Sequence, residues 1–470
     1  MSTDQQLVGT HRLQPAAPGA KVTRLELFYD LVFVFAFINV TNAAAKTLGQ
    51  GGLLGGVLVL ALLWFAWTSF ATLGNAVRAD RGIMPLFGFA TMAAIFVASL
   101  SVPEAFSDDP PGLPGDLVFA ACYLVVRDLQ VLAFWYAVRN DPKLRPRWRR
   151  LAGPPFITVT LLLVAALVPQ RLFDGTAELA ARVALWVLAI AVAYVLGQRT
   201  RTEGLAIVSA GHWAERHAQI ILIALGESII SLGVGPGLSA GLPLTWPVIW
   251  AATLGIAVIA ALWWLYFDSR AIAGEQAMHR VHGRARTALA RDAYSYLHLP
   301  MILGIILFAL GLKRTLAAIA ESASAGLRER VDALDVVLLH GGVIVYLLAV
   351  LGFQRRTLHW TSRFQVVSLV VLAALVPAGA ALAPFGALAL LVVAIVLIAT
   401  VDTLRMRQHR QRLREEKFEE ERALEAEETE LRRRRLAAAE ADPDSRRGDH
   451  DQAAAHPPGD HRPADGDDAR

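Results

Sequence analysis

Residues 24–37 read R-L-E-L-F-Y-D-L-V-F-V-F-A-F and place two carboxylates, Glu26 and Asp30, at the start of a long apolar run. The run extends to about residue 45, and about 20 apolar residues suffice for a helix to cross the hydrocarbon core of a bilayer. A charged side chain inside that core costs about 2.5–3.5 kcal/mol on insertion scales. The stretch therefore predicts a membrane-spanning helix whose carboxylates need a partner, a water-filled cavity or protonation.

The composition extends this prediction to most of the chain. Hydrophobic residues make up 55% of the 470 residues and charged residues 18%, with a mean hydropathy of +0.45. One soluble core cannot bury so many apolar side chains, so the bulk of the chain is expected to lie in lipid. We place about twelve spanning windows at 25–45, 52–73, 83–102, 116–138, 154–170, 178–197, 214–234, 245–267, 292–312, 334–353, 363–382 and 384–404.

Lys and Arg predict the orientation of these helices, because short cytoplasmic loops retain positive charge. The two residue types are concentrated in alternate loops, most of all in R-N-D-P-K-L-R-P-R-W-R-R at 139–150, whereas the loop at 101–112 carries acid and no base. The loop at 313–333 mixes both signs and fits this scheme least well. No secretory signal is evident in the polar first twenty residues. Both ends of the chain are expected to be cytoplasmic.

The windows divide into two halves that resemble each other weakly. Aligning Glu26 with Glu215 sets Asp30 against Gln219, and the second and eighth windows each carry a tryptophan-rich stretch. An even number of helices per half gives both halves the same orientation, related by an axis normal to the membrane. The predicted fold is an all-α integral membrane protein of about twelve transmembrane helices in two six-helix pseudo-repeats, near 23–200 and 201–404.

Polar segments flank this transmembrane domain. Residues 1–22 are predicted to be a cytoplasmic N-terminal segment, 405–441 a charged cytoplasmic helix and 442–470 a disordered tail. The charged helix is either a solvated single helix or a coiled-coil or partner-binding helix. Its mixed charge argues against nucleic-acid binding. The one cysteine, Cys122, lies within the fourth window, so neither an internal disulfide nor a cysteine-based metal site is expected.

The first window has one polar face. Residues within about 80° of one another, at about 100° per residue, are Glu26, Asp30, Phe33, Phe37 and Thr41. Glu26 lies in the first turn, where an acid complements the helix N-terminus, and we expect it to cap the helix. Asp30 lies deeper and is expected to face the bundle interior and meet a cation.

The seventh window carries more polar residues, reading H-W-A-E-R-H-A-Q-I-I-L-I-A-L-G-E-S-I-I over 212–230. Its polar stripe contains His212, Arg216, Gln219 and Glu227, with Glu215 just beyond the edge. Glu227 is expected near the middle of the membrane, which makes it the costliest carboxylate in the chain. It either lies protonated against a backbone carbonyl or takes part in the passage of a proton or cation.

Arg127 is the predicted buried cation. It lies in Y-L-V-V-R-D-L-Q on the fourth window, about 11 residues from either end, where its side chain can neither lose its proton nor reach the interface. We predict a pair with Asp30 or Glu227, and an anion-binding role is the alternative. The candidate ion, proton or substrate pathway therefore consists of Asp30, Arg127 and Glu227.

Enzyme motifs are missing from the sequence. It lacks the H-E-x-x-H spacing, a Gly-x-Ser-x-Gly elbow, a phosphate loop and a cysteine pair. No catalytic residue, metal ligand or cofactor is predicted, and an intramembrane enzyme is the least favoured function.

Two segments carry a family resemblance. The stretch E-L-F-Y-D-L-V-F-V-F-A-F at 26–37, taken together with the stretch at 212–230, resembles the paired signatures of the bacterial low-temperature-requirement A family. The resemblance extends more weakly over about 20–404 and includes Y-L-H-L-P-M-I-L-G-I at 296–305. It implies a multi-pass protein of the bacterial cytoplasmic membrane. The supporting motif residues are Glu26, Tyr29, His212, Glu215, Arg216, Gln219 and Gly226.

Two functions fit these residues. The first is a transporter, coupled to protons or cations, that carries a small solute or cation. The second is a non-catalytic sensor or scaffold whose buried charges only hold helices together, with a homo-oligomer or protein partner recruited through 405–441. The lipid bilayer is the expected surrounding in both cases.

Overall fold

The computed structural model describes residues 21–46, 52–105, 112–140, 142, 148–204, 207–233, 245–325 and 332–441. Regular structure within these ranges is helical throughout. The chain divides into two compact units, a body up to Arg407 and a second unit from Gln408 onward. The predicted disordered tail at 442–470 and nearly all of the N-terminal segment 1–22 lie outside the described residues.

The helices of the body follow the predicted windows closely. In chain order they are α2 (Arg24–Lys46), α3 (Gly52–Ala76), α4 (Met84–Ser101), η2 (Val102–Glu104), α5 (Gly115–Val138), α6 (Trp148–Leu167), α7 (Pro169–Leu172), α8 (Gly175–Gly204), α9 (Ala210–Gly233), α11 (Trp246–Phe267), α12 (Arg270–Arg280), α13 (Gly283–Leu289), η4 (Ala290–Tyr296), α14 (His298–Ala325), α15 (Ala333–Leu358), α16 (Arg363–Ala380) and α17 (Pro384–Arg405). The described residues of the second unit belong to α18 (Arg407–Ala441).

Eleven helical segments of the described chain are long and apolar enough to cross a membrane. They match eleven of the predicted windows. The seventh window is present as the 24-residue helix α9, but α9 is not one of the eleven. Its apolar residues are interrupted by His212, Glu215, Arg216, His217, Gln219 and Glu227.

Three boundaries differ from the prediction. Helix α6 begins at Trp148 and contains Pro154 and Pro155, whereas the predicted window begins at residue 154. Helix α12 occupies residues expected in a loop. Helix α14 continues to Ala325, so Lys313 and Arg314 are helical rather than part of a mixed-charge loop. Both cations bond acceptors on other helices, which offsets the cost of their position.

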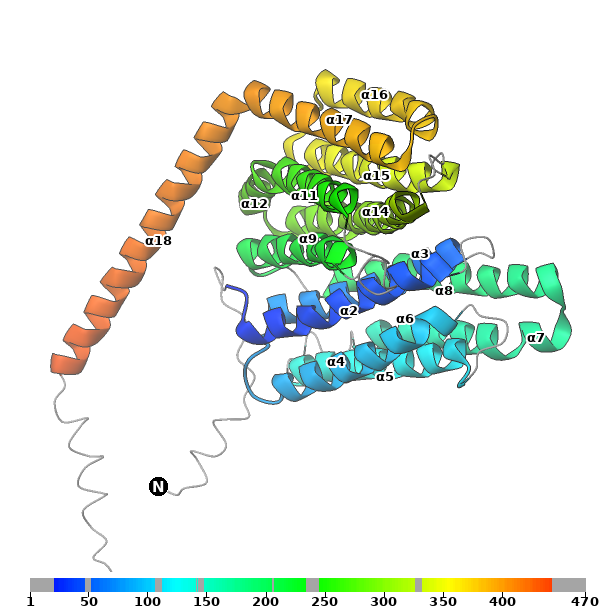
Figure 1. The fold of residues 1–470 in the computed structure, drawn as a ribbon. Coiled ribbons are helices and arrows are strands. Elements are labelled where there is room, and N and C mark those ends of the chain that lie inside the picture. Colours follow the sequence, from blue (N-terminus) through cyan, green and yellow to red (C-terminus); the bar gives the residue numbers. More distant parts are fainter. Residues whose placement is uncertain are drawn as a thin grey trace, which may run out of the picture. The chain divides into compact units, whose positions relative to one another are not determined.

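The helices of each half pack in the same order. In the first half, α2 packs on α3 and α4, and contacts continue from α4 to α5, α5 to α6, and α6 to α8, which returns to α3. In the second half, α9 packs on α11 and α14, and contacts continue from α14 to α15, α15 to α16, and α16 to α17, which returns to α11. Figure 1 shows α2 and α9 side by side where the two sets of helices meet.

Candidate functional site

The N-terminus of α2 forms a reciprocal cap. The backbone N–H and the hydroxyl of Thr23 each donate to Oε2 of Glu26 at 2.9 Å, and the Glu26 N–H donates to the Thr23 hydroxyl at 3.3 Å. This is the capping-box arrangement, in which two otherwise unpaired helix N–H groups are satisfied. The prediction that Glu26 caps the helix is therefore confirmed.

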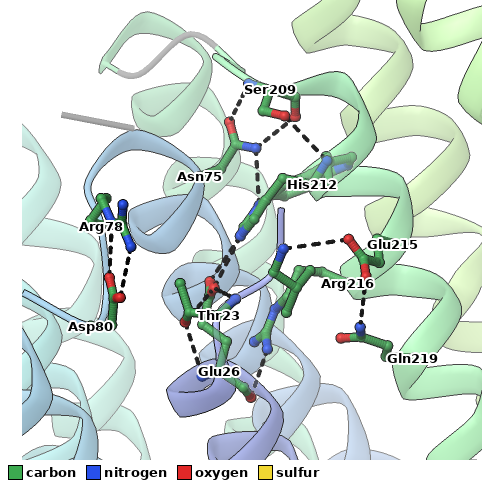
Figure 2. A network of polar contacts seen from close by, with 12 residues as sticks. Thr23, Glu26, Asn75, Arg78, Asp80, Ser209, His212, Glu215, Arg216 and Gln219 are labelled. Carbon is green, nitrogen blue, oxygen red and sulfur yellow. Dashed lines mark hydrogen bonds and ion pairs between the residues drawn. The ribbon is translucent and has the colours of Figure 1, made fainter. Parts of the chain in front are cut away.

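Glu26 also joins α2 to α9. His212 Nε2 lies 3.0 and 3.1 Å from the two carboxylate oxygens, and both side chains are buried (Figure 2). The Asn75 amide fixes the imidazole tautomer, because its nitrogen donates to the Ser209 carbonyl and faces His212 Nδ1 at 3.2 Å while its oxygen accepts from the backbone N–H of Val208. His212 Nδ1 must then accept, and Nε2 donates to Glu26.

One turn deeper, Asp30 pairs with Arg216. The Arg216 Nη1 donates to Asp30 Oδ2 and to the Glu26 carbonyl, both at 2.8 Å, and the Trp67 indole N–H donates to Asp30 Oδ1 at 2.8 Å. The Arg216 and Asp30 side chains are 0% and 1% exposed. The Arg216 guanidinium lies 5.3 Å from the centroid of the Trp67 ring, a cation–π distance. Asp30 thus faces inward and meets a cation, as predicted.

Glu227 is held by hydroxyl groups. Its Oε1 accepts from Thr41 at 3.1 Å and from Ser231 at 2.7 Å, whereas Oε2 has no hydrogen-bond partner although the residue is 0% exposed. Lys313 donates to Asn42, next to Thr41, at 3.0 Å. Glu227 therefore has no direct cationic partner among the described residues, and one of its oxygens is available.

A constant register relates these contacts. Glu26 with His212, Asp30 with Arg216, and Thr41 with Glu227 are each separated by 186 positions. Contacts at one fixed offset require two helices that run in the same direction. The α2–α9 interface is thus a parallel helix pair with polar groups at three levels over about 22 Å, given a rise of about 1.5 Å per residue.

The predicted pair between Arg127 and Asp30 or Glu227 is wrong. Arg127 Nη1 donates to the Ser69 hydroxyl at 2.7 Å and to the Gln130 side-chain oxygen, and its guanidinium lies 4.9 Å from the Phe65 ring centroid. Helix α5 packs mainly on α4 and α6, while Arg216 reaches Asp30 from α9. The ring and two side-chain oxygens surround the Arg127 cation in place of a carboxylate.

The remaining motif residues differ in how deeply their side chains are buried. Tyr29 is buried and stacks on Phe70 with ring centroids 3.9 Å apart. Glu215 is exposed and accepts from the half-buried Gln219 at 3.4 Å (Figure 2). A Cβ built on Gly226 would meet no atom within 4 Å. Tyr29 lies next to Asp30 on α2, and Glu215 also accepts from the backbone N–H of Val22, just before α2, at 3.4 Å.

Sequence reasoning missed two residues that complete the site, Trp67 and Asn75. Both lie on the strongly apolar α3, where an indole and an amide that need partners are the only local signals of a polar role. Beyond the end of α3, Arg78 bonds Asp80 at 2.8 Å, and this hydrogen bond holds the pKa of the Asp80 carboxyl below its ordinary value (Figure 2). The described residues contain no group of three or more His, Cys, Asp or Glu side chains suited to a metal ion.

These observations define a multi-pass helical membrane protein with ionisable groups buried between its halves. The family model for the bacterial low temperature requirement A protein (LtrA) matches residues 21–400, and the chain belongs to this family. An uncharacterized protein of Rhizobium meliloti (strain 1021) is 29% identical over 301 residues, which cover 61% of this chain and 67% of that protein. The predicted family is therefore confirmed.

Proposed function

We propose that this protein is a membrane transporter coupled to protons or cations and that its pathway follows the α2–α9 interface. The observation that carries the proposal is Glu227, a fully buried carboxylate bonded only to hydroxyl groups on one oxygen. Such a group is costly in hydrocarbon unless it is protonated or binds a cation, and the site offers oxygen ligands for either. Alkali cations and protons both bind to carboxylate and hydroxyl oxygens.

The other levels of the interface provide ionisable groups on the same route. Asp30 is bonded to Arg216 and Trp67, so a proton or cation that reaches Asp30 must compete with the Arg216 guanidinium. Glu26 and His212 form the level nearest the N-terminus of α2. In this proposal the chain is not an enzyme, carries no resident cofactor and binds no nucleic acid. The transported species is a small solute or cation.

We also infer that α9 is a twelfth span, so that the body consists of two six-helix repeats. The 24-residue helix is about 36 Å long and runs parallel to α2, one of the eleven spans, as six preceding spans would require. The matching order of helix contacts in the two halves supports a repeat. An offset of 186 supports aligning Glu26 with His212 rather than with Glu215. Alternate basic loops support cytoplasmic ends in the bacterial inner membrane.

Neutralising Glu227 tests the transport proposal. Solid-supported-membrane electrophysiology on protein reconstituted in liposomes, with imposed proton, sodium and potassium gradients, should give a current that Glu227→Gln reduces at least tenfold. Glu215→Gln is the matched control, because it removes an exposed carboxylate from the same helix. We expect the control to retain the current. Equal currents from the wild type and both variants would contradict a role for Glu227 in transport.

A structural role for the same charges is the second candidate. Asp30, Arg216 and Trp67 form a closely bonded group that ties α2, α3 and α9 together, which is what a sensor or scaffold requires. The charged helix α18 then provides a surface for a second copy or a protein partner. Two results together would favour this candidate. No folded variant would give a current, and removal of residues 408–470 would abolish the function of the protein in cells.

A further inference from the structure

His217, on α9, is a buried imidazole with one unused nitrogen. Its Nδ1 lies 2.9 Å from the Trp213 carbonyl. Because a carbonyl only accepts, Nδ1 carries the hydrogen, and Nε2 is left with its lone pair in the neutral ring. Nε2 has no hydrogen-bond partner, and the residue is 0% exposed. The structure therefore buries a basic nitrogen that is free to accept a proton.

Rings from four elements surround this imidazole. Ring centroids lie 4.5–5.8 Å from that of His217, and the rings belong to Trp64, Trp67, Trp213, Tyr294 and His298. The face of an aromatic ring attracts a cation, whereas its edge is the positive end of the ring quadrupole. The Tyr294 hydroxyl is also buried without a hydrogen-bond partner. Nε2 of His217 therefore lies among aromatic rings, with no carboxylate in direct contact among the described residues.

A π-helix builds one wall of this cluster. The turn η4 is π-helical over Ala290–Tyr296, and such turns are rare and frequently lie at functional sites. The Ser295 carbonyl accepts from the Trp64 indole at 2.7 Å, and the Ala293 carbonyl lies 3.2 Å from His298 Nδ1. The π-helix thus positions Tyr294 and His298 and fixes Trp64 against His217.

The neighbouring imidazole differs in one respect. His298 Nδ1 also faces a carbonyl, but its Nε2 lies 2.8 Å from the Tyr266 hydroxyl and so accepts from it. His298 is therefore occupied at both nitrogens, whereas His217 is occupied at one. Within this cluster, His217 is the imidazole with an available site.

Trp67 connects this cluster to the acidic site. Its N–H donates to Asp30, its ring lies edge-on to His217 at 4.9 Å, and the Arg216 guanidinium lies 5.3 Å from the ring centroid. We propose that His217 is a second proton-binding group and that its charge excludes a cation from Asp30, so that the protein exchanges protons for monovalent cations. This inference rests on the proposed transport function.

The charges around His217 give the sign of the coupling. On α9 it faces Arg216 and His212, on η4 Tyr294, and on α14 His298, while α3 contributes indole rings. Beyond the Trp67 ring, the Arg216 charge is balanced by Asp30. A proton on Nε2 adds a positive charge beside this neutral pair and opposes a further cation at Asp30. By thermodynamic linkage, a cation at Asp30 lowers the proton affinity of His217 by the same factor.

Tryptophan fluorescence reports protonation of His217 without a transport assay, because three of the 11 tryptophans contact its ring and an imidazolium quenches indole emission. Wild-type protein in lipid nanodiscs, titrated from pH 9 to 4, should show a quenching step that His217→Asn removes. Asn keeps a donor for the Trp213 carbonyl and lacks Nε2, and His217→Gln serves if the Asn variant unfolds. His340→Asn, which alters a buried histidine on α15, is the matched control and should keep the step.

Cation dependence tests the exchange. Raising the potassium or sodium concentration should move the midpoint of the quenching step to lower pH. The shift should be at most about one pH unit for each tenfold rise in concentration, which is the limit when one cation competes with one proton. Asp30→Asn should abolish that cation-dependent shift, and because it leaves the Arg216 charge unbalanced, it should also move the quenching step itself to lower pH. A step that survives in both His217 variants, or a midpoint that neither cation moves, overturns the proposal. Because no flux is measured, these outcomes are independent of the Glu227 transport test.

Discussion

Asp30 has a cationic partner that lies 186 positions further along the chain. Both side chains are buried. A buried ion pair gains from its mutual attraction only after the large cost of removing both charges from water. Trp67 contributes a hydrogen bond to one oxygen and its ring to the guanidinium, which offsets part of that cost. The three side chains act as one unit, and removal of one member leaves the others in an unfavourable environment.

The Asp30–Arg216 pair predicts a non-additive stability effect. Asp30→Asn leaves the buried Arg216 guanidinium uncompensated and should lower the free energy of unfolding by about 3–5 kcal/mol. Combining Asp30→Asn with Arg216→Met should cost less than the sum of the single changes, because the double variant buries no unpaired charge. Thermal unfolding of the detergent-solubilised proteins, followed by circular dichroism, measures both.

Asp80→Asn is the control for this cycle, because it breaks a partly exposed pair with Arg78 and should cost at most about 1 kcal/mol. If Asp30→Asn lowered the free energy of unfolding as little as Asp80→Asn does, Asp30 would not be a buried charge that Arg216 needs.

At the scale of elements, α14 and α15 approach each other through glycine. A Cβ on Gly304 would meet the Tyr346 backbone nitrogen at 2.5 Å, and a Cβ on Gly342 would meet the backbone of Phe308 and the carbonyl of Gly304. Small residues at such crossings let helix backbones pack closely in membranes, where helix association depends on van der Waals contact. This close packing keeps α14, which carries Lys313 and continues from η4, in a fixed position.

Two adjacent glycines of α15 provide a matched test of this packing. Gly342→Ala should destabilise the protein by about 1–3 kcal/mol, because backbone atoms of α14 cannot move aside as a side chain can. A Cβ on Gly341 would meet only a Val337 methyl group at 4.0 Å, so Gly341→Ala should be neutral or stabilising by up to about 1 kcal/mol. The melting temperatures of the two variants, measured under the same conditions, test this difference. A more damaging Gly341→Ala would refute the assigned crossing.

At the scale of the whole molecule, the body and the second unit are compact separately. The contacts of the α2–α9 interface and of the His217 cluster all lie within residues of the body. The site therefore needs no residue of α18 beyond Arg407.

Truncation after Arg407 tests that independence. The shortened protein should keep its melting temperature within about 2 °C, since no contact of the site is removed, and it should keep the Glu227-dependent current. A transport current lost from a folded truncated protein would show that α18 takes part in transport. The same sample, compared with the full chain by multi-angle light scattering, reports whether α18 holds two copies together.

Local properties of the sequence were sufficient to predict the spanning helices, the cap formed by Glu26 and the inward-facing side of α2. Each depends on residues within one helix, where hydropathy over about 20 positions and a period of about 3.6 residues carry the information. The polar residues of α9 lowered its hydropathy, and three of them, His212, Arg216 and Glu227, are the ones that contact α2.

Only the tertiary structure decided which charges meet. Arg127 and Arg216 were both available to Asp30 by depth and charge, and the packing of α9 beside α2 at a single register selected Arg216. The tautomer of His217 and the route through Trp67 likewise depend on contacts between helices. Partner choice is a property of helix packing, because side chains far apart in sequence compete for one position, and no periodicity within a single helix encodes which of them is closer.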